Sequence, residues 1–207
     1  MNLFITGTDT DVGKTFVSSL LVRGLRRAGF DTVAMKPICC GDRDDAEMLR
    51  KAAGNSLELN DVNPVWLRTP SAPYTASVIE NRNIDLDLIR ETFARLRQNH
   101  RSLIVEGVGG WLVPIRRDYF VSDLAADFGL PVAVVVRNRL GALNHALLTV
   151  RSIQSSGLQC DGIIWNNMDA TDDVAGTTNK SMLEDLLDVP ILFEIEKDQP
   201  ELVLGVA

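Results

Sequence analysis

The sequence predicts an α/β fold, in which a doubly wound, mainly parallel sheet is flanked by helices on both faces. Two patterns indicate this fold. Short apolar runs alternate with amphipathic helical stretches, and Val132–Val136 is apolar at every position. A continuous apolar run is typical of a parallel strand covered on both faces. Ligands of such sheets bind at the carboxyl ends of the strands, so candidate functional residues are sought there.

The first predicted elements lie before residue 54. A strand at Leu3–Ile5 is followed by a glycine-bounded loop and by a helix that opens at Gly13. Apolar residues at helical spacing continue this helix, and Gly29 can end it. The next elements are a strand at Thr32–Met35, which leads to Lys36-Pro37, a polar loop over Asp42–Asp45 and a helix over Ala46–Ala53.

The rest of the chain continues the alternation after one irregular stretch. We expect Asn60–Thr75 to be irregular and loop-like, because it holds Pro64, Pro70 and Pro73. Helices are predicted over Asp85–Asn99, Ser122–Phe128 and Ala142–Ile153 and around Leu183, Leu186 and Leu187. Strands are predicted at Leu103–Val105, Val132–Val136, Gly162–Trp165 and Ile191–Phe193.

The composition favours one globular domain. A chain of 207 residues with 45% hydrophobic content can fill one sizeable α/β core, and it has no linker-like segment or internal repeat. We therefore expect a single domain over residues 1–207. The net charge of −7 argues against non-specific binding to nucleic acid, which depends on an excess of basic residues.

Cysteine usage and apolar runs indicate the compartment. The chain has three cysteines, and two of them, Cys39 and Cys40, are adjacent, which argues against a disulfide framework. The first residues lack the basic region of a signal peptide, and Leu130–Val136 is too short to span a bilayer. We expect a cytoplasmic protein that does not bind membranes.

The loop after the first strand has the features of a P-loop. It runs from Gly7 to Thr15 and reads Gly-Thr-Asp-Thr-Asp-Val-Gly-Lys-Thr. Its backbone N–H groups and the helix amino terminus would replace the water around a triphosphate. Lys14 would reach the β- and γ-phosphates, and the Thr15 hydroxyl would hold Mg²⁺. The residues assigned here to ATP binding are Asp11, Val12, Gly13, Lys14, Thr15 and Phe16.

The spacing of this loop departs from the usual pattern. Five residues separate Gly7 from Gly13 where four are expected, so Thr8 stands at the position of the first glycine. The alternative is a plain strand–helix turn. The order of strand, loop and helix favours a nucleotide site in a P-loop NTPase-like fold.

Charged residues near the strand ends suggest phosphoryl transfer. Lys36 follows the second strand, where a second ammonium group would stabilise the charge that develops on a transferring phosphate. Glu106 ends a buried strand, and together with Thr15 and Asp45 it would supply the few oxygen ligands that Mg²⁺ takes from a protein. Each residue taken alone also has an interpretation without function: Lys36 as a surface group, Asp45 as part of a solvated loop and Glu106 as a carboxylate that ends a strand.

Backbone and amide groups complete the predicted nucleotide site. Gly107, Val108 and Gly109 follow Glu106 in a glycine-rich turn that allows the backbone to approach a ligand closely. Asn166 and Asn167 follow a later strand, where a side-chain amide would pair with N6 and N7 of adenine. Either asparagine could instead form a turn.

Together these motifs resemble those of dethiobiotin synthetases, including the extra residue in the phosphate loop. The likeness spans nearly the whole chain in matching order. Besides the loop, it is carried by Lys36-Pro37, Asp45-Ala46, Val62-Asn63-Pro64, Val105-Glu106-Gly107-Val108-Gly109-Gly110-Trp111 and Leu140-Gly141-Ala142-Leu143-Asn144-His145-Ala146.

The resemblance implies an ATP-dependent ring closure in biotin synthesis. The substrates would be 7,8-diaminononanoate, CO₂ (or bicarbonate) and ATP, with Mg²⁺ as cofactor. A carbamate formed on one amine would attack the γ-phosphate, and the second amine would close on the mixed anhydride to give dethiobiotin. By matching position, Thr15, Asp45 and Glu106 would bind Mg²⁺, Lys14 and Lys36 would be catalytic, and Asn166 would read adenine.

The resemblance also implies a substrate site and a homodimer, because family members are dimers with substrate sites near the subunit boundary. Lys36 and Cys40 would lie near the substrate, and Leu140 and Gly141, with Asn144, would hold its carboxylate. The chain departs from the family at three places: Cys40 replaces a common serine, a tyrosine common near Asn179 is absent, and Glu194-Ile195-Glu196 stands where a proline is common.

Three other functions remain open from the sequence. A nucleotide-driven switch of the partition or septum-site type usually carries an additional lysine early in the loop, where this chain has Thr8-Asp9-Thr10. A cobalamin-pathway amidotransferase would need room for a glutaminase domain. A relative that binds nucleotide without synthetase activity is the third.

Overall fold

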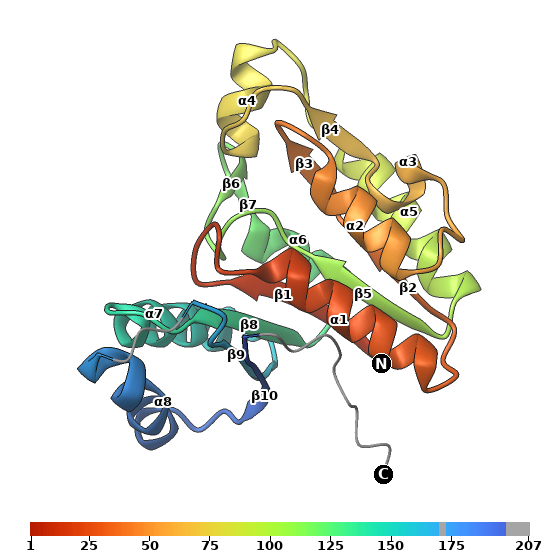
Figure 1. Ribbon diagram of the computed structural model, residues 1–207. Coiled ribbons are helices and arrows are strands. Elements are labelled where there is room, and N and C mark those ends of the chain that lie inside the picture. Colours follow the sequence, from red (N-terminus) through yellow and green to blue (C-terminus); the bar gives the residue numbers. More distant parts are fainter. Residues whose placement is uncertain (170–172, 198–207) are drawn as a thin grey trace.

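The computed structural model of the protein describes residues 1–169 and 173–197 and has at its centre a six-stranded parallel sheet, in the order β10-β9-β8-β1-β5-β2 (Figure 1). The strands are β1 (Asn2–Gly7), β2 (Thr32–Met35), β5 (Ser102–Glu106), β8 (Val132–Arg137), β9 (Cys160–Asn166) and β10 (Ile191–Ile195). All five neighbouring pairs run parallel. The predicted fold class is confirmed.

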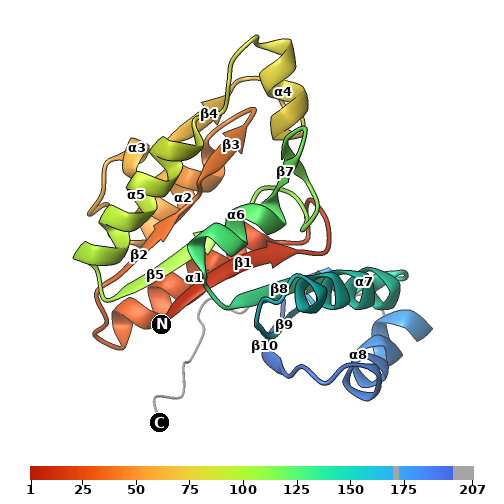
Figure 2. The same ribbon diagram turned by 180° about the vertical axis from the view of Figure 1, so that it is seen from behind.

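Helices cover both faces of this sheet (Figures 1 and 2). One face carries α1 (Lys14–Arg27) and α2 (Asp44–Ala52), and the other carries α5 (Leu86–Asn99), α6 (Val121–Phe128) and α7 (Ala142–Ser155), with α8 (Val174–Leu186) beside α7. Strand β1 serves both layers, because alternate side chains of a strand point to opposite faces. Leu3 and Ile5 belong to the core under α1, whereas Phe4 belongs to the core on the other face.

The segment Asn60–Thr75, expected to be irregular, is so only at residues 63–64 and 68–72, and the prediction is wrong for the rest. It contains most of α3 (Leu59–Val62), all of β4 (Val65–Leu67) and the start of α4 (Pro73–Ile79). Pro73 is the first residue of α4, a position whose N–H needs no partner within the helix. Strand β4 pairs with β3 (Ile38–Cys40) in a separate two-stranded parallel sheet. Pro64 and Pro73 therefore stand where short elements begin, and Pro70 lies in the loop between β4 and α4.

The start of α2 corrects a second prediction. The sequence suggested a loop over Asp42–Asp45, but α2 begins at Asp44 and carries Asp44 and Asp45 in its first turn. Carboxylates are favourable there, because the first turn of a helix presents unpaired N–H groups and the positive end of its dipole. Asp45 is therefore held by a helix.

The remaining predicted helices and strands are confirmed, with ends that differ by a few residues. Four strands were not predicted: β3 and β4, described above, and β6 (Pro114–Arg116) and β7 (Tyr119–Phe120), which form an antiparallel pair after β5. All three cysteines carry free thiols. Across residues 1–169 and 173–197, the longest apolar stretches of helix fall short of what a bilayer-spanning segment requires.

Candidate functional site

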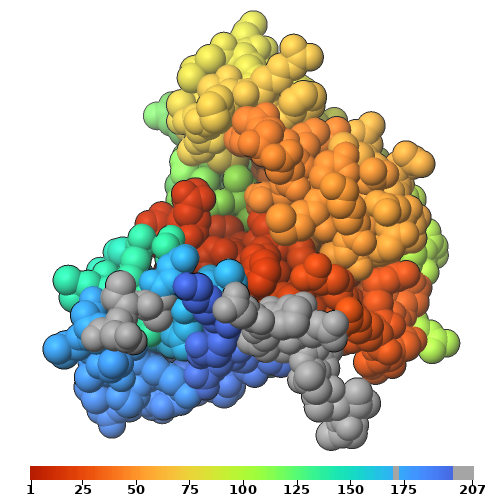
Figure 3. Space-filling view, in the orientation of Figure 1, coloured from red at the N-terminus to blue at the C-terminus, as the bar shows by residue number. Residues whose placement is uncertain are grey.

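The carboxyl ends of β1, β2 and β5 lie at one edge of the sheet, beside a cavity of about 740 Å³. Its walls come from the loop after β1, the segment from Lys36 to Asp45, the stretch Pro70–Pro73 and the turn after β5. Figure 3 shows the molecule hollowed between the red amino-terminal part and the orange and yellow segments. The predicted site residues that line the cavity are Asp11, Gly13, Lys14, Thr15, Phe16, Lys36, Cys40, Asp45, Val108 and Gly109.

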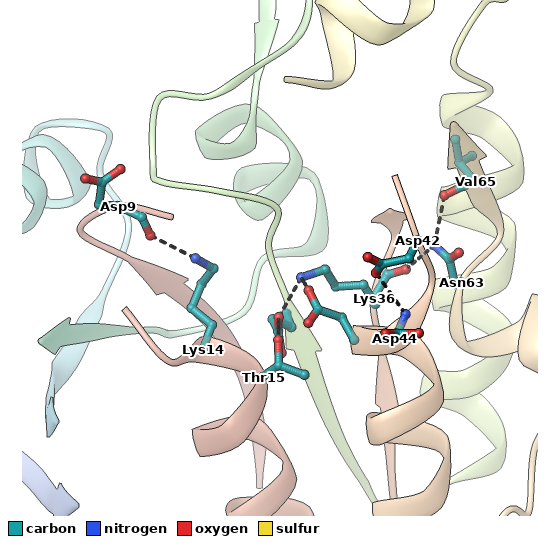
Figure 4. A network of polar contacts seen from close by, with 10 residues as sticks. Asp9, Lys14, Thr15, Lys36, Asp42, Asp44, Asn63 and Val65 are labelled. Atoms are coloured by element: carbon teal, nitrogen blue, oxygen red, sulfur yellow. Dashed lines mark hydrogen bonds and ion pairs between the residues drawn. The ribbon is translucent and has the colours of Figure 1, made fainter. Parts of the chain in front are cut away.

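Lys14 is the first residue of α1, and its side chain turns back across the loop. Its ammonium donates a hydrogen bond to the main-chain carbonyl of Asp9 at 2.9 Å (Figure 4). The residue is 7% exposed. Burial, followed by the nearby Lys36 ammonium, lowers the pKa of Lys14 from 10.5 to about 8. The lysine is therefore charged at neutral pH and lies within the loop that would receive phosphate.

Lys36 and Glu106 form a buried ion pair at the centre of the site. The Lys36 ammonium lies 2.6 Å from Glu106 Oε1 and 2.8 Å from Asp45 Oδ2. The Thr15 hydroxyl donates to the same Glu106 oxygen at 2.8 Å. Side chains from α1, α2, β5 and the end of β2 thus meet around one ammonium group (Figure 4).

The charge states of this group follow from its contacts. Burial alone would lower the pKa of Lys36, but the Glu106 and Asp45 carboxylates outweigh it and hold the pKa above its ordinary value. Burial would likewise raise the pKa of Asp45, and the Lys36 ammonium outweighs that effect, so the pKa is lowered. Lys36 is therefore an ammonium and Asp45 a carboxylate at neutral pH.

The oxygen atoms here fit a hard divalent cation. Glu106 is fully buried, and its Oε2 atom has no hydrogen-bond partner within the protein, so it is free to accept a ligand. Residues 1–169 and 173–197 hold no cluster of three or more His, Cys, Asp or Glu suited to a metal. Mg²⁺ prefers one or two carboxylates with phosphate and water. Two carboxylates and the Thr15 hydroxyl match that preference.

Asn166 lies behind the phosphate loop and does not line the cavity. It is 5% exposed, its amide donates to the carbonyl of Val12 at 2.9 Å, and its side-chain oxygen accepts from the N–H of Met168 at 3.0 Å. Gly13 has φ of 93°, and a Cβ at that position would come within 2.4 Å of the Asn166 side-chain nitrogen. Glycine is therefore required at position 13 both by its backbone conformation and by this close approach.

Several other predicted residues lie away from the cavity lining. Leu140, Gly141 and Asn144 stand at the exposed amino terminus of α7, and Leu140 is 84% exposed. The side-chain oxygen of Asn167 accepts a hydrogen bond from Asn138. The remaining predicted site residues outside the lining are Val12, which is buried, Glu106 and Gly107.

Two departures from the family pattern have clear positions in the structure. The thiol of Cys40 lines the cavity, and burial, followed by the charge of Glu80, raises its pKa to about 11. It is therefore a neutral, weak hydrogen-bond donor. Asn179 is 4% exposed and donates to Asn138 Oδ1 and the Arg139 carbonyl, so its side chain points into its own subunit.

Sequence reasoning missed part of the cavity wall. The lining residues absent from the prediction are Thr10, Cys39, Asp42, Pro70, Ser71, Ala72, Pro73 and Val113. Four of them are consecutive residues of the segment expected to be irregular. Pro73 was the available signal, since proline is common at the first position of a helix.

The chain is similar to curated proteins over most of its length. A family model described as an AAA domain matches residues 1–201. The ATP-dependent dethiobiotin synthetase of Akkermansia muciniphila is 49% identical over 194 residues, covering 94% of this chain and 91% of that protein. The enzyme of the same name from Bacillus subtilis strain 168 is 38% identical, covering 91% and 84%. That from Methanocaldococcus jannaschii is 40% identical over 168 residues, covering 79% and 78%.

Solved structures with the same fold are more distant in sequence. The septum site-determining protein MinD of Pyrococcus horikoshii, complexed with Mg-ADP, has a TM-score of 0.62 at 16% identity and covers 96% of this chain and 82% of that one. A ParA family ATPase from Chlorobium tepidum has a TM-score of 0.57 at 12% identity, covering 95% and 84%. Likeness at this identity concerns the fold alone.

Proposed function

The chain belongs to the family of ATP-dependent dethiobiotin synthetases, ligases of biotin biosynthesis, and on that premise we propose how its cavity carries out the ring closure. We propose that 7,8-diaminononanoate, CO₂ and the terminal phosphate of ATP meet beside Lys14 and Lys36. The observation that carries this proposal is the ammonium of Lys36, 2.6 Å from Glu106 and 2.8 Å from Asp45, at the mouth of the phosphate loop.

The reaction needs no nucleophile from the protein. One amine of the substrate adds to CO₂ and loses a proton, which gives a carbamate. A carbamate oxygen then attacks the γ-phosphorus, and the bond to the leaving ADP breaks. The second amine attacks the carbon of the resulting mixed anhydride, phosphate leaves, and loss of a proton completes the cyclic urea.

The protein contributes positioning and positive charge, which is most of what phosphoryl transfer requires. Lys14, together with the N–H groups at the start of α1, would hold the β- and γ-phosphates. Lys36 would neutralise the charge shared by the carbamate oxygen and the transferring phosphoryl group. Both ammonium groups line the same cavity, so they can act on one phosphate from two sides.

Thr15, Asp45 and Glu106 would hold Mg²⁺, which would supply positive charge beside the phosphates of ATP. The Lys36 ammonium forms ion pairs with the carboxylates of Asp45 and Glu106 in this structure. The Oε2 atom of Glu106, which has no hydrogen-bond partner within the protein, supports a cation at this place.

We further propose a homodimer in which the amino terminus of α7 serves the substrate. Leu140, Gly141 and Asn144 do not line the cavity of their own subunit and are exposed. Free N–H groups at a helix amino terminus bind carboxylates well. In a dimer with its substrate sites at the subunit boundary, this terminus would receive the substrate's carboxylate.

The test is a product assay with the diamine, bicarbonate and MgATP. Release of ADP should depend on the diamine, and dethiobiotin should form in equal amount. Lys14→Ala should lower turnover by at least ~10²-fold, as loss of a comparable charge stabiliser does. ADP release that ignores the diamine would instead indicate a nucleotide-driven switch, and near-normal turnover of Lys14→Ala would remove Lys14 from the mechanism.

A further inference from the structure

Asn63 lies between α3 and β4, in a Val-Asn-Pro segment that has no part in the mechanism above. It is 1% exposed, and its amide nitrogen donates to the Lys36 carbonyl at 2.9 Å and the Val65 carbonyl at 2.8 Å (Figure 4). The N–H of Lys36 donates to the carbonyl of Val62 at 2.7 Å. Both backbone polar groups of Lys36 are therefore paired with this one segment.

Lys36 requires such support because the sheet ends before it. Strand β2 is an edge strand, and its register with β5 ends at Met35 opposite Val105. A buried carbonyl left without a partner destabilises the protein, so the Lys36 backbone would shift to find one. A shift of the backbone would carry the ammonium away from Glu106.

Arg43 extends this support to the opposite side of the site. Its Nε donates to Asn63 Oδ1 at 2.9 Å, and a terminal nitrogen donates to the Asn63 carbonyl at 2.8 Å. Arg43 immediately precedes α2, the helix that carries Asp45, and its guanidinium lies over the ring of Trp66. One buried asparagine thus connects the backbone of Lys36 to the start of the helix that bears its partner.

We propose that Asn63 and Arg43 act as a positioning pair, which fixes the Lys36 ammonium relative to Asp45 and Glu106 for the transfer step. This inference rests on the role proposed above for Lys36. Neither Asn63 nor Arg43 lines the cavity, so both act through other residues. A merely structural role would instead predict the same loss of activity whichever residue stands at position 36.

A double-mutant cycle separates these two roles. In the otherwise unchanged enzyme, Asn63→Ser should lower the single-turnover rate by ~10-fold or more. The KM for ATP should change by less than ~2-fold, because the lost interaction acts mainly in the transition state. In the Lys36→Met background, the same substitution should change the rate by less than ~2-fold, because the group that it positions is gone. Equal losses in both backgrounds would overturn the proposal.

A second measurement does not depend on activity. Acylation of lysine side chains by a water-soluble reagent, followed residue by residue with mass spectrometry, reports how well Lys36 is held. Asn63→Ser and Arg43→Gln should each raise the labelling of Lys36 by ~5-fold or more, as freer local opening allows, with labelling of the exposed Lys197 unchanged. Asn60→Ala is the matched control, because it removes only an exposed hydrogen bond to Arg43 at 3.1 Å.

The two measurements can fail separately. If Lys36→Met leaves turnover unchanged, the proposed role of Lys36 fails, and labelling alone decides whether Asn63 and Arg43 hold its side chain. If Asn63→Ser does not fold, Arg43→Gln replaces it in the cycle, since Arg43 is only partly buried. Unchanged labelling of Lys36 in the folded variants overturns the inference.

Discussion

The two lysines of the site differ in how firmly they hold their protons. The carboxylates of Asp45 and Glu106 keep the pKa of Lys36 above its ordinary value, whereas burial and the charge of Lys36 bring that of Lys14 down to about 8. A rise in pH through the alkaline range therefore reaches Lys14 first. The phosphate loop loses a positive charge while the ion pair beside it stays intact.

Binding of ATP should consequently weaken above pH 8. Below that value the Lys14 ammonium is already charged. Above it, the lysine must take up a proton to meet the phosphates, so the Kd should rise by up to ~10-fold per pH unit. Calorimetric titration of a non-hydrolysable ATP analogue between about pH 7 and about pH 9.5 measures this change.

The matched variant for this titration is Lys14→Arg, whose guanidinium stays charged throughout the range and should flatten the profile. A Kd of the unchanged protein that does not vary with pH would contradict the assignment of Lys14 to phosphate.

Glu106→Gln should raise the Mg²⁺ concentration needed for half-maximal turnover by at least ~5-fold, because one unit charge within ~4 Å is worth about 1 kcal/mol even in bulk water. A Mg²⁺ titration of turnover at saturating ATP measures this concentration. Asp44→Asn is the control, since it removes the same charge from the first turn of α2 at an exposed position. If the Mg²⁺ titrations of Glu106→Gln and of the unchanged protein superimpose, Glu106 is not a ligand of the metal.

At the level of single residues, the sequence predicts the charged groups better than the amides. Lys36 and Glu106 stand at the ends of strands, and parallel strands bring such ends to one edge, so their proximity is predictable without a structure. Asn63 stands in the Val62-Asn63-Pro64 motif, but no local pattern indicates what its side chain contacts. Its two carbonyl partners depend on the tertiary course of a segment whose prolines predicted only a loop.

At the scale of elements, the cap of α5 offers a test of stability apart from the site. The Asp85 side chain accepts a hydrogen bond from the N–H of Leu88 at 2.9 Å. Asp85→Ala should lower the Tm by about 2–4 °C, because loss of such a cap weakens the first turn of the helix. Thermal unfolding followed by circular dichroism measures the shift.

The control for this cap is Asp87→Ala, which removes a neighbouring carboxylate whose ion pair with Arg90 is exposed and weak. The KM for ATP should stay unchanged in both variants. Equal shifts of Tm would show that charge, and not the cap, is responsible.

Long elements and short elements differ in how far the sequence predicts them. Helices such as α5 and α7 have fourteen residues each, enough for a helical repeat of apolar positions to be recognised. Strands β3 and β4 have three residues each and stabilise one another outside the main sheet, so no local pattern identifies them. The cavity wall at Pro70–Pro73 follows β4, so its place beside the site depends on these short strands although its prolines were visible in the sequence.

At the scale of the whole molecule, one face of α7 has no partner within the described part of the chain. Asn144 and Leu148 are one helical turn apart, both are exposed, and Leu148 is 62% exposed. An apolar side chain beside a predicted substrate ligand is consistent with the subunit boundary of the proposed homodimer.

Sedimentation equilibrium should therefore give twice the mass of one chain, and Leu148→Asp should weaken the association by ~10-fold or more, since a buried unpaired carboxylate costs several kcal/mol. Leu112→Asp is a suitable control, because Leu112 has similar exposure, 60%, and lies on another part of the chain. A monomer at all concentrations would exclude a substrate site shared between subunits.

The hydrogen bond from the Asn166 amide to the Val12 carbonyl joins residues that are 154 positions apart in the chain. Replacing Asn166, the residue predicted to read adenine, would also remove its hydrogen bond to the backbone of the predicted phosphate loop. A change of nucleotide preference therefore requires substitutions at more than one position. Useful variants should come from libraries that diversify positions 12 and 166 together.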